Sequence, residues 1–272
     1  MIANHNEAML GQFEQYLAQI ALSPKTVTNY LADLRVFTRW AETTQAPQFS
    51  VTGVTADQIR QYRNYLLEEQ GRAPSTVNRH LQALRKCCAY MAQTNLAPGN
   101  AAEEISLITA EKRCAPGAIK GADIDALLAA ANNSRTFIAR RDAAILHLLV
   151  NAGLRVAEVV GLKTGDVFFD YPGVHLTIRD SRGRGTRDIP LLPGVCGALK
   201  EWLLIRPRAT VLPHLFLSQE GTPISTRTVQ RIVNRCAKTA GVSGVTAQLL
   251  RRTYAVRLLK ETANLELVRQ RL

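Results

Sequence analysis

Two arginine-containing segments hold the side chains of this sequence that are best suited to chemistry. Residues 151–162 read Asn-Ala-Gly-Leu-Arg-Val-Ala-Glu-Val-Val-Gly-Leu, which places Arg155 three positions before Glu158. Residues 250–255 read Leu-Arg-Arg-Thr-Tyr-Ala and contain a second pair of arginines. A guanidinium stays charged and offers a fork of donors, so two arginines can bind the oxygens of a phosphate. For the first segment alone, a structural ion pair between Arg155 and Glu158 at helical spacing is an equally good interpretation.

The sequence around Arg155 predicts two helices that hold it in a rigid frame. Residues 142–150 have the apolar periodicity of a buried helix, and Gly153 is the natural residue to end that helix. The next helix is anchored by the apolar side chains of Leu154, Val156, Val159, Val160 and Leu162. Because an arginine beside apolar surface is costly unless it is paired, the charge of Arg155 requires a partner or a function.

Taken together, the two segments resemble the tyrosine recombinases, also called phage-type integrases. The motifs of that family read roughly Thr-Gly-Leu-Arg-x-x-Glu and His-x-Leu-Arg-His-Thr-Phe-Ala, in this order along the chain. The resemblance extends from about residue 10 to the last residue. It implies a mainly α-helical protein with a small antiparallel β-sheet and two domains, a helical core-binding bundle and a recombinase catalytic domain.

The resemblance also implies a reaction and a role for the arginines. In this family a tyrosine hydroxyl attacks a DNA phosphodiester, which gives a 3′-phosphotyrosyl link and a free 5′-hydroxyl. Arg155 and Arg251 are then the two clamps on the phosphate oxygens, where negative charge gathers, and Glu158 orients the first clamp. The implied partner is double-stranded DNA, bound by a homo-tetramer on paired sites if the protein is complete. Since the sequence has no glycine-rich phosphate loop and no carboxylate cluster suited to magnesium, no cofactor or metal is expected.

Several positions depart from the family pattern. Gln248 stands where the family has a histidine, and glutamine can donate to a phosphate oxygen but cannot carry a proton at neutral pH. Arg182 matches the hairpin lysine that protonates the leaving 5′-oxygen, a task for which an always-charged arginine is poorly suited. The register of this hairpin is open by two residues, so Arg184 or Arg187 could lie at the phosphate, and a solvent-exposed basic turn is the alternative. Arg252 stands where the family most often has a histidine.

The last residues also bear on the reaction. Residues 264–272 resemble the helix just before a Leu-Gly-His segment of the family, and the sequence stops at Leu272. The histidine of that segment and the nucleophilic tyrosine are therefore expected beyond this residue, and truncation is the favoured interpretation. Tyr254 lies where the family has a buried aromatic residue, so core packing is preferred to a catalytic role.

Two other interpretations stay open at this stage. Another subunit could supply the nucleophile. Alternatively, the protein could be a non-catalytic DNA-binding regulator or an inactive remnant that keeps the arginine clamp. Gln248 and Arg182 favour the second alternative, because both replace titratable groups with groups that do not titrate at neutral pH.

The composition favours a polyanionic partner. The 34 lysines and arginines outnumber the 22 acidic residues and give a formal net charge of +12, which points first to nucleic acid. No apolar run reaches the length of a membrane-spanning helix and no signal peptide opens the chain, so no membrane association is expected. The five cysteines are scattered without metal-ligand spacing, which is typical of reduced thiols in a cytoplasmic protein.

The sequence predicts two domains joined by a linker. Residues 1–100 are expected to form the helical, SAM-like core-binding domain, with helix starts at Ser23 and Thr55. Residues 101–120 are predicted to be the linker, since a proline- and glycine-containing cluster precedes them and periodicity is weak. Residues 121–272 are expected to form the catalytic domain. Its predicted strands cover residues 167–169, 174–178 and 188–191.

The first domain carries a predicted DNA-contact surface. The helices that begin near Pro24 and Pro74 repeat one pattern of apolar and basic residues, which either similar helix starts or an internal duplication would produce. The basic side chains expected to face DNA phosphates are Lys25, Arg35, Arg39, Arg79, Arg85 and Lys86. A solvated helix face is the alternative, and the net positive charge favours DNA.

Overall fold

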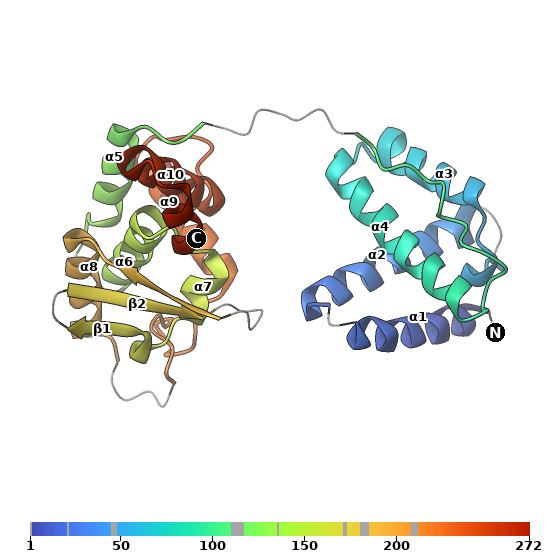
Figure 1. Ribbon diagram of the computed structural model, residues 1–272, viewed down its shortest axis with the longest axis horizontal. Helices are drawn as coiled ribbons and strands as arrows, with labels where there is room; N and C mark the ends of the chain where they lie inside the picture. Colours follow the sequence, from blue (N-terminus) through green and yellow to red (C-terminus); the bar gives the residue numbers. More distant parts are fainter. Residues whose placement is uncertain are drawn as a thin grey trace. The chain divides into compact units, whose positions relative to one another are not determined.

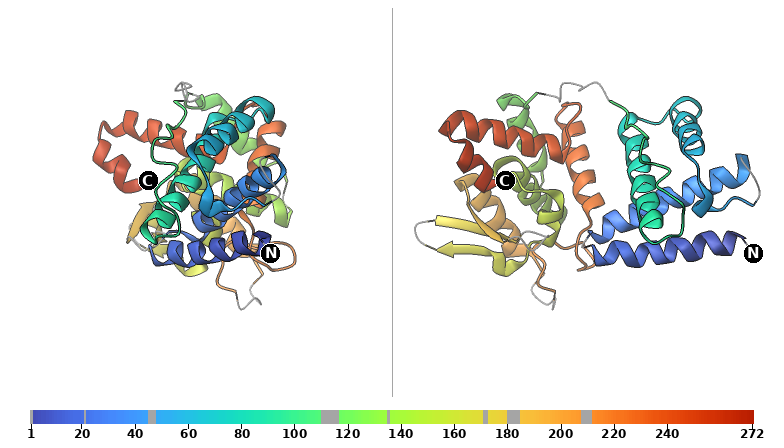
Figure 2. Two further views of the ribbon diagram at one scale, coloured as in Figure 1. Left: turned by 90° about the vertical axis from the view of Figure 1, so that its right-hand side faces the viewer. Right: turned by 45° about the vertical axis from the view of Figure 1, so that its right-hand side comes forward.

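The computed structural model describes residues 2–20, 22–44, 48–109, 117–134, 136–170, 173–179, 185–207 and 212–272. The chain forms two compact units, Met1–Arg113 and Cys114–Leu272, each with its own hydrophobic core (Figures 1 and 2). Most described residues are helical, and the strands form one antiparallel sheet. The expected fold class, mainly α with a small antiparallel sheet and two domains, is confirmed.

The first unit is a helical bundle. Its helices are α1 (Ile2–Gln19), α2 (Pro24–Thr44), α3 (Ala56–Asn64) and α4 (Pro74–Gln93), with a short 3₁₀ turn η1 (Val51–Gly53) and a π-helical turn η2 (Tyr65–Glu69). Helix α2 contacts the other three helices, so it forms the centre of the bundle. Thr55 caps α3 through the predicted capping box, in which its hydroxyl accepts from the Gln58 backbone and the Gln58 side chain accepts in return. The sequence showed no start signal for α1.

The residues after α4 fold back onto the first unit. Ala102 and Ile105 are buried in its core, and the Asn78 side chain exchanges two hydrogen bonds with the backbone of Ile108, at 2.9 and 2.8 Å. At the other end of the predicted linker, the Ile119 backbone donates to Thr253 in the second unit at 3.0 Å. Breaker residues end α4 here, but the apolar side chains that follow them still bury surface against their own unit. Residues 110–116 lie outside the described residues.

The second unit combines helices with the small sheet. Its elements are α5 (Gly121–Ala131), α6 (Phe137–Asn151), α7 (Val156–Gly161), η3 (Thr164–Asp166), β1 (Val167–Asp170), β2 (Gly173–Arg179), β3 (Thr186–Pro190), α8 (Pro193–Ile205), α9 (Thr226–Thr239), α10 (Ala247–Thr262) and α11 (Leu265–Arg271). The strands lie in the order β1-β2-β3 and pair antiparallel, with Phe168 opposite His175 and Thr177 opposite Asp188. All three strands overlap the predicted ones.

Helix α6 is the buried centre of the second unit. Nearly all its side chains from Arg141 to Val150 are buried, as the apolar run in this segment predicted. Helices α5, α7, α8, α9 and α10 all contact α6, while α11 contacts α10 and β3 (Figure 1). The amino-terminal ends of α7 and α10 are thereby held on one rigid core, which is the condition for placing two distant arginines together.

Candidate active site

Arg155 stands on a turn that requires glycine. Gly153 has a φ of +63°, in the left-handed region, and a Cβ atom at this position would overlap the ring of Tyr254. The turn ends α6 and makes Arg155 the N-cap residue of α7. Glu158 closes this first turn, because its carboxylate accepts from the Arg155 backbone N–H at 2.7 Å and from the Arg155 guanidinium at 2.9 Å. The ion pair expected from the spacing is therefore present.

The Glu158 carboxylate is shared by three arginines. In addition to Arg155, Nη2 of Arg187 donates to it at 2.9 Å and Nη1 of Arg251 lies 3.5 Å away. The Glu158 side chain is only 6% exposed, whereas Arg155 is 56% exposed and presents its guanidinium to solvent. One negative charge stands among three positive ones, so the cluster keeps a net positive charge that can attract an anion.

The ionisation of the cluster follows from its contacts. Burial acts to raise the pKa of Glu158, but hydrogen bonds from Arg187 and from the Arg155 backbone outweigh it and hold the pKa below its usual range. Burial lowers the pKa of the Arg251 guanidinium to about 10; the positive charges of Arg155 and Arg187 act in the same direction, and Glu158 opposes them. Both groups are thus charged at neutral pH.

A cavity of about 440 Å³ opens beside these arginines. Its lining consists of Arg155, Val156, Ala247, Gln248, Arg251, Arg252, Ala255 and Leu272. The cavity lies at the first turn of α10, where backbone N–H groups and the helix dipole favour an anion. Arg155 and Arg251, 96 positions apart, therefore line one pocket together with Gln248 and Arg252.

Arg251 is held in this pocket by two backbone carbonyls. Its Nη1 donates to the carbonyl oxygen of Gly153 at 2.7 Å, and its Nη2 donates to the carbonyl oxygen of Leu272. The first bond joins α10 directly to the glycine turn that presents Arg155. The side chain is 16% exposed, so its outer edge remains open to a ligand in the cavity.

Arg187 lies behind the carboxylate and not on the open surface. Its side chain is 18% exposed, and its Nε donates to the carbonyl oxygen of Arg271 at 3.2 Å. Arg271 in turn donates to the carbonyl oxygen of Asp188 at 3.2 Å, which ties α11 to β3. The sequence predicted a DNA contact for Arg187, but these bonds direct its guanidinium to Glu158 and α11. The other hairpin candidates, Arg182 and Arg184, lie outside the described residues.

Tyr254 packs against the glycine turn, as core packing predicted. It lines a separate cavity of about 170 Å³ together with Asn151 and Arg257, and burial raises the pKa of its phenol. Within the part of the chain that the structure describes, no tyrosine lines the arginine pocket. Tyr254 therefore contributes to the frame of the site.

The basic residues predicted on the first unit divide into two groups. Three have protein partners: Arg35 forms an ion pair with Glu7 at 3.0 Å, Arg79 forms one with Asp33 at 2.7 Å, and Arg85 donates to the carbonyl oxygen of Ile105. Lys25 and Arg39 are exposed and Lys86 is partly exposed. Arg35 and Arg79 are 47% and 42% exposed, so each ion-paired guanidinium still meets solvent.

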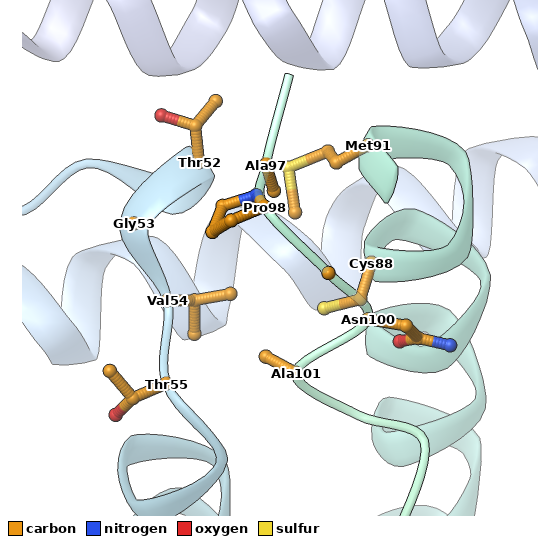
Figure 3. Close-up of a pocket in the computed structure, with 11 residues that line it drawn as sticks. Thr52, Gly53, Val54, Thr55, Cys88, Met91, Ala97, Pro98, Asn100 and Ala101 are labelled. Atoms are coloured by element: carbon orange, nitrogen blue, oxygen red, sulfur yellow. The ribbon is translucent and has the colours of Figure 1, made fainter. Parts of the chain in front are cut away.

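A second cavity, of about 370 Å³, lies within the first unit between η1 and the segment that follows α4 (Figure 3). Figure 3 shows Val54, Met91, Pro98 and Cys88 directed towards this space. No lysine, arginine or acidic side chain lines it, so this cavity offers nothing that would bind a phosphate.

The described ranges of the chain hold no group of three or more histidine, cysteine or acidic side chains placed to bind a metal ion. None of the helices in these ranges is long and apolar enough to cross a membrane.

Sequence comparison matches both units to known families. A sequence model described as the phage integrase family matches residues 118–272, and one described as the phage integrase N-terminal SAM-like domain matches residues 10–95. A tyrosine recombinase XerC of Neisseria meningitidis serogroup C is 28% identical over 97% of this chain and 87% of its own length. A tyrosine recombinase XerC of Alcanivorax borkumensis is 30% identical over 92% of this chain and 79% of its own length.

Solved structures share the fold. A lambda integrase fragment, residues 75–356, crystallised as a dimer bound to a core site, superposes with a TM-score of 0.76 at 18% identity and covers 98% of this chain and 93% of that one. A XerH site-specific recombinase in a post-cleavage complex with its palindromic substrate gives a TM-score of 0.75 at 19% identity, over 90% of this chain and 72% of that one.

Proposed function

Because the chain belongs to the phage integrase family, we propose that it breaks and rejoins DNA at specific sites through a 3′-phosphotyrosyl intermediate. The pocket shared by Arg155 and Arg251 around Glu158 is the observation that carries this proposal. Relatives similar over most of the chain are tyrosine recombinases, which supports the same reaction class.

The arginines would stabilise the phosphate as it gathers charge. Arg155 reaches it from the start of α7 and Arg251 from the first turns of α10, so each can bind a different non-bridging oxygen. Glu158 keeps both guanidinium groups in place, and the largely buried Arg187 holds Glu158 through a further ion pair. Gln248, exposed at the mouth of the pocket, would donate a third hydrogen bond.

The proposed partner is double-stranded DNA. Besides the pocket, which Arg252 also lines, its contacts would include Arg182, Arg184 and the exposed basic residues of the first unit, among them Lys25 and Lys86. We also propose that the protein assembles as an oligomer on paired sites, since the similar lambda integrase has been crystallised as a dimer on a core site and as a tetramer on a Holliday junction.

The test is the capture of the covalent intermediate. The protein expressed from its full open reading frame is incubated with nicked duplex DNA, and adducts that resist denaturation are sought. A phosphotyrosyl adduct is expected, and replacing Arg155 and Arg251 together by alanine should abolish it. A full-length protein that carries a tyrosine and both arginines but never forms an adduct would refute the enzymatic proposal.

A second candidate is a non-catalytic DNA-binding regulator. The position of Gln248 in the pocket favours it, because glutamine cannot transfer a proton at the site where the family has a histidine. If a full-length protein that carries a tyrosine and Gln248→His binds DNA but still forms no adduct, this candidate replaces the first.

A further inference from the structure

A buried carboxylate lies inside the first unit, away from the arginine pocket. The Asp33 side chain, on α2, is only 5% exposed, and its partners are Arg79 and His80 on α4. A buried charge is costly and needs a reason. Burial raises the pKa of the Asp33 carboxyl, and Arg79 opposes this effect. Burial therefore works against the ionised carboxylate, and the ion pair with Arg79 offsets part of that cost.

Two further side chains set the orientation of this carboxylate. His80 Nε2 lies 3.4 Å from Oδ1 of Asp33, and the hydroxyl of Tyr62, on α3, lies 3.0 Å from His80 Nδ1. Burial lowers the pKa of His80 to about 4, so the ring is neutral and carries one proton. In this protonation state Tyr62 can donate to Nδ1 while Nε2–H points to Oδ1 of Asp33. The chain of contacts from Tyr62 through His80 to Asp33, called the relay below, leaves Oδ2 of Asp33 directed at Arg79, 2.7 Å from its Nη1.

Arg79 is where this relay reaches the surface. Its side chain is 42% exposed, while those of Asp33 and His80 are 5% and 9% exposed and Tyr62 is fully buried. A guanidinium has five N–H donors, so the contact with Asp33 leaves donors for a ligand from solvent. A flexible surface arginine loses conformational entropy when it binds a ligand. Arg79 avoids much of that loss because Asp33 already holds it in place.

We propose that Asp33 is a positioning residue that holds the Arg79 guanidinium ready for a phosphate of duplex DNA, and that His80 and Tyr62 orient its carboxylate. The inference rests on the proposed DNA-binding function and adds a device within the first unit. A second ion pair on the same unit serves as the comparison. Arg35 pairs with Glu7, which is itself 56% exposed and has no buried relay behind it among the described residues.

The direction in which Asp33→Asn changes DNA affinity distinguishes a positioning role of Asp33 from an effect of its charge alone. By charge alone, Asp33→Asn makes the protein more positive and should tighten DNA binding. If Asp33 positions Arg79, the same change weakens binding by about two- to fivefold in a protein that circular dichroism shows to be folded. The matched change Glu7→Gln removes an exposed carboxylate beside Arg35 and is expected to leave affinity unchanged or raised.

The experiment measures binding of the full chain to a fluorescent DNA duplex of mixed sequence, over a series of salt concentrations. Arg79→Gln is expected to lower the slope of log affinity against log salt by about 0.9, the value for one phosphate contact. Arg79→Lys, which keeps the charge, should preserve the slope. Thermal melts followed by circular dichroism identify any variant whose binding is lost through unfolding.

A double-mutant cycle shows whether Asp33 acts through Arg79. The loss caused by Asp33→Asn should disappear in the Arg79→Gln background, because the positioned group is then absent. A loss that persists in that background, a tightening by Asp33→Asn, or an unchanged slope in Arg79→Gln each overturns the inference. If the unsubstituted chain shows no salt-dependent binding, the proposed function itself fails; if it binds and only these variants disagree, the inference alone fails.

Discussion

Replacing Glu158 by glutamine tests whether one carboxylate holds the arginine cluster together. The change keeps the shape of the side chain but removes the charge that faces Arg155, Arg187 and Arg251. Arg187 and Arg251 are largely buried, and breaking a buried pair costs about 3–5 kcal/mol because an uncompensated charge is left behind. The exposed Arg155 contributes only about 0–1 kcal/mol. Since glutamine still accepts hydrogen bonds, we expect the free energy of unfolding of the second unit to fall by about 2–4 kcal/mol.

The assay is denaturant unfolding followed by tryptophan fluorescence. The two tryptophans lie in different units, and Trp202 is fully buried in the second. In a Trp40→Phe background the signal therefore reports on the unit that holds Glu158. Glu201→Gln is the matched control, because Glu201 is 59% exposed and its pair with Arg140, at 2.6 Å, should contribute at most about 1 kcal/mol.

The difference in unfolding free energy between the native chain and Glu158→Gln should also depend on pH in a predictable direction. The pKa of Glu158 is lowered in the folded protein, so its contribution is complete above the unfolded value of about 4.3. That contribution is lost as pH falls through the lower, folded pKa. The difference between the native chain and Glu158→Gln should therefore be full at neutral pH and shrink in strong acid. A loss below about 1 kcal/mol, or a difference that does not change with pH, would refute this reasoning.

The remaining predictions concern the pocket and its frame. Arg155→Ala combined with Arg251→Ala should abolish adduct formation by an active chain, while most duplex affinity remains in a filter-binding assay; each lost guanidinium should reduce the salt slope by about 0.9. Gly153→Ala should lower the free energy of unfolding of the second unit by more than about 1–2 kcal/mol, because it adds a clash with an aromatic ring to a positive φ. Gly53→Ala, in open space in the first unit, should raise that unit's free energy of unfolding by about 0.4–1 kcal/mol, in a denaturant titration followed by the fluorescence of Trp40. Thr55→Ala removes a capping box and should cost about 0.5–2 kcal/mol, measured by thermal melting of the first unit.

The glycine turn shows how much of the site was encoded locally. Gly153 ends one helix and Arg155 starts the next, and both features follow from residue types at fixed spacing. Glu158 lies at the third position of the same helix, so its pairing with Arg155 is also a local matter. For these reasons the sequence predicted this half of the pocket residue by residue.

Arg187 shows the opposite case. It lies 29 positions from Glu158 on strand β3, and only the tertiary fold brings the two groups to 2.9 Å. No periodicity relates them, so the sequence could assign Arg187 only to a basic hairpin. The pairing of Asp33 with Arg79 was missed for the same reason, because the sequence alone does not show that a second helix covers an acidic residue of an amphipathic helix.

What the sequence determined by itself was local: helix starts set by caps, the buried periodicity of α6, the glycine turn and the pairing of Arg155 with Glu158. The tertiary structure alone decided which distant charges meet. It set Arg251 beside the turn, directed Arg187 inward and closed the relay from Tyr62 to Arg79. The physical reason is that capping and turn preferences depend on neighbouring residues, whereas the partner of a charge depends on which helices and strands pack together.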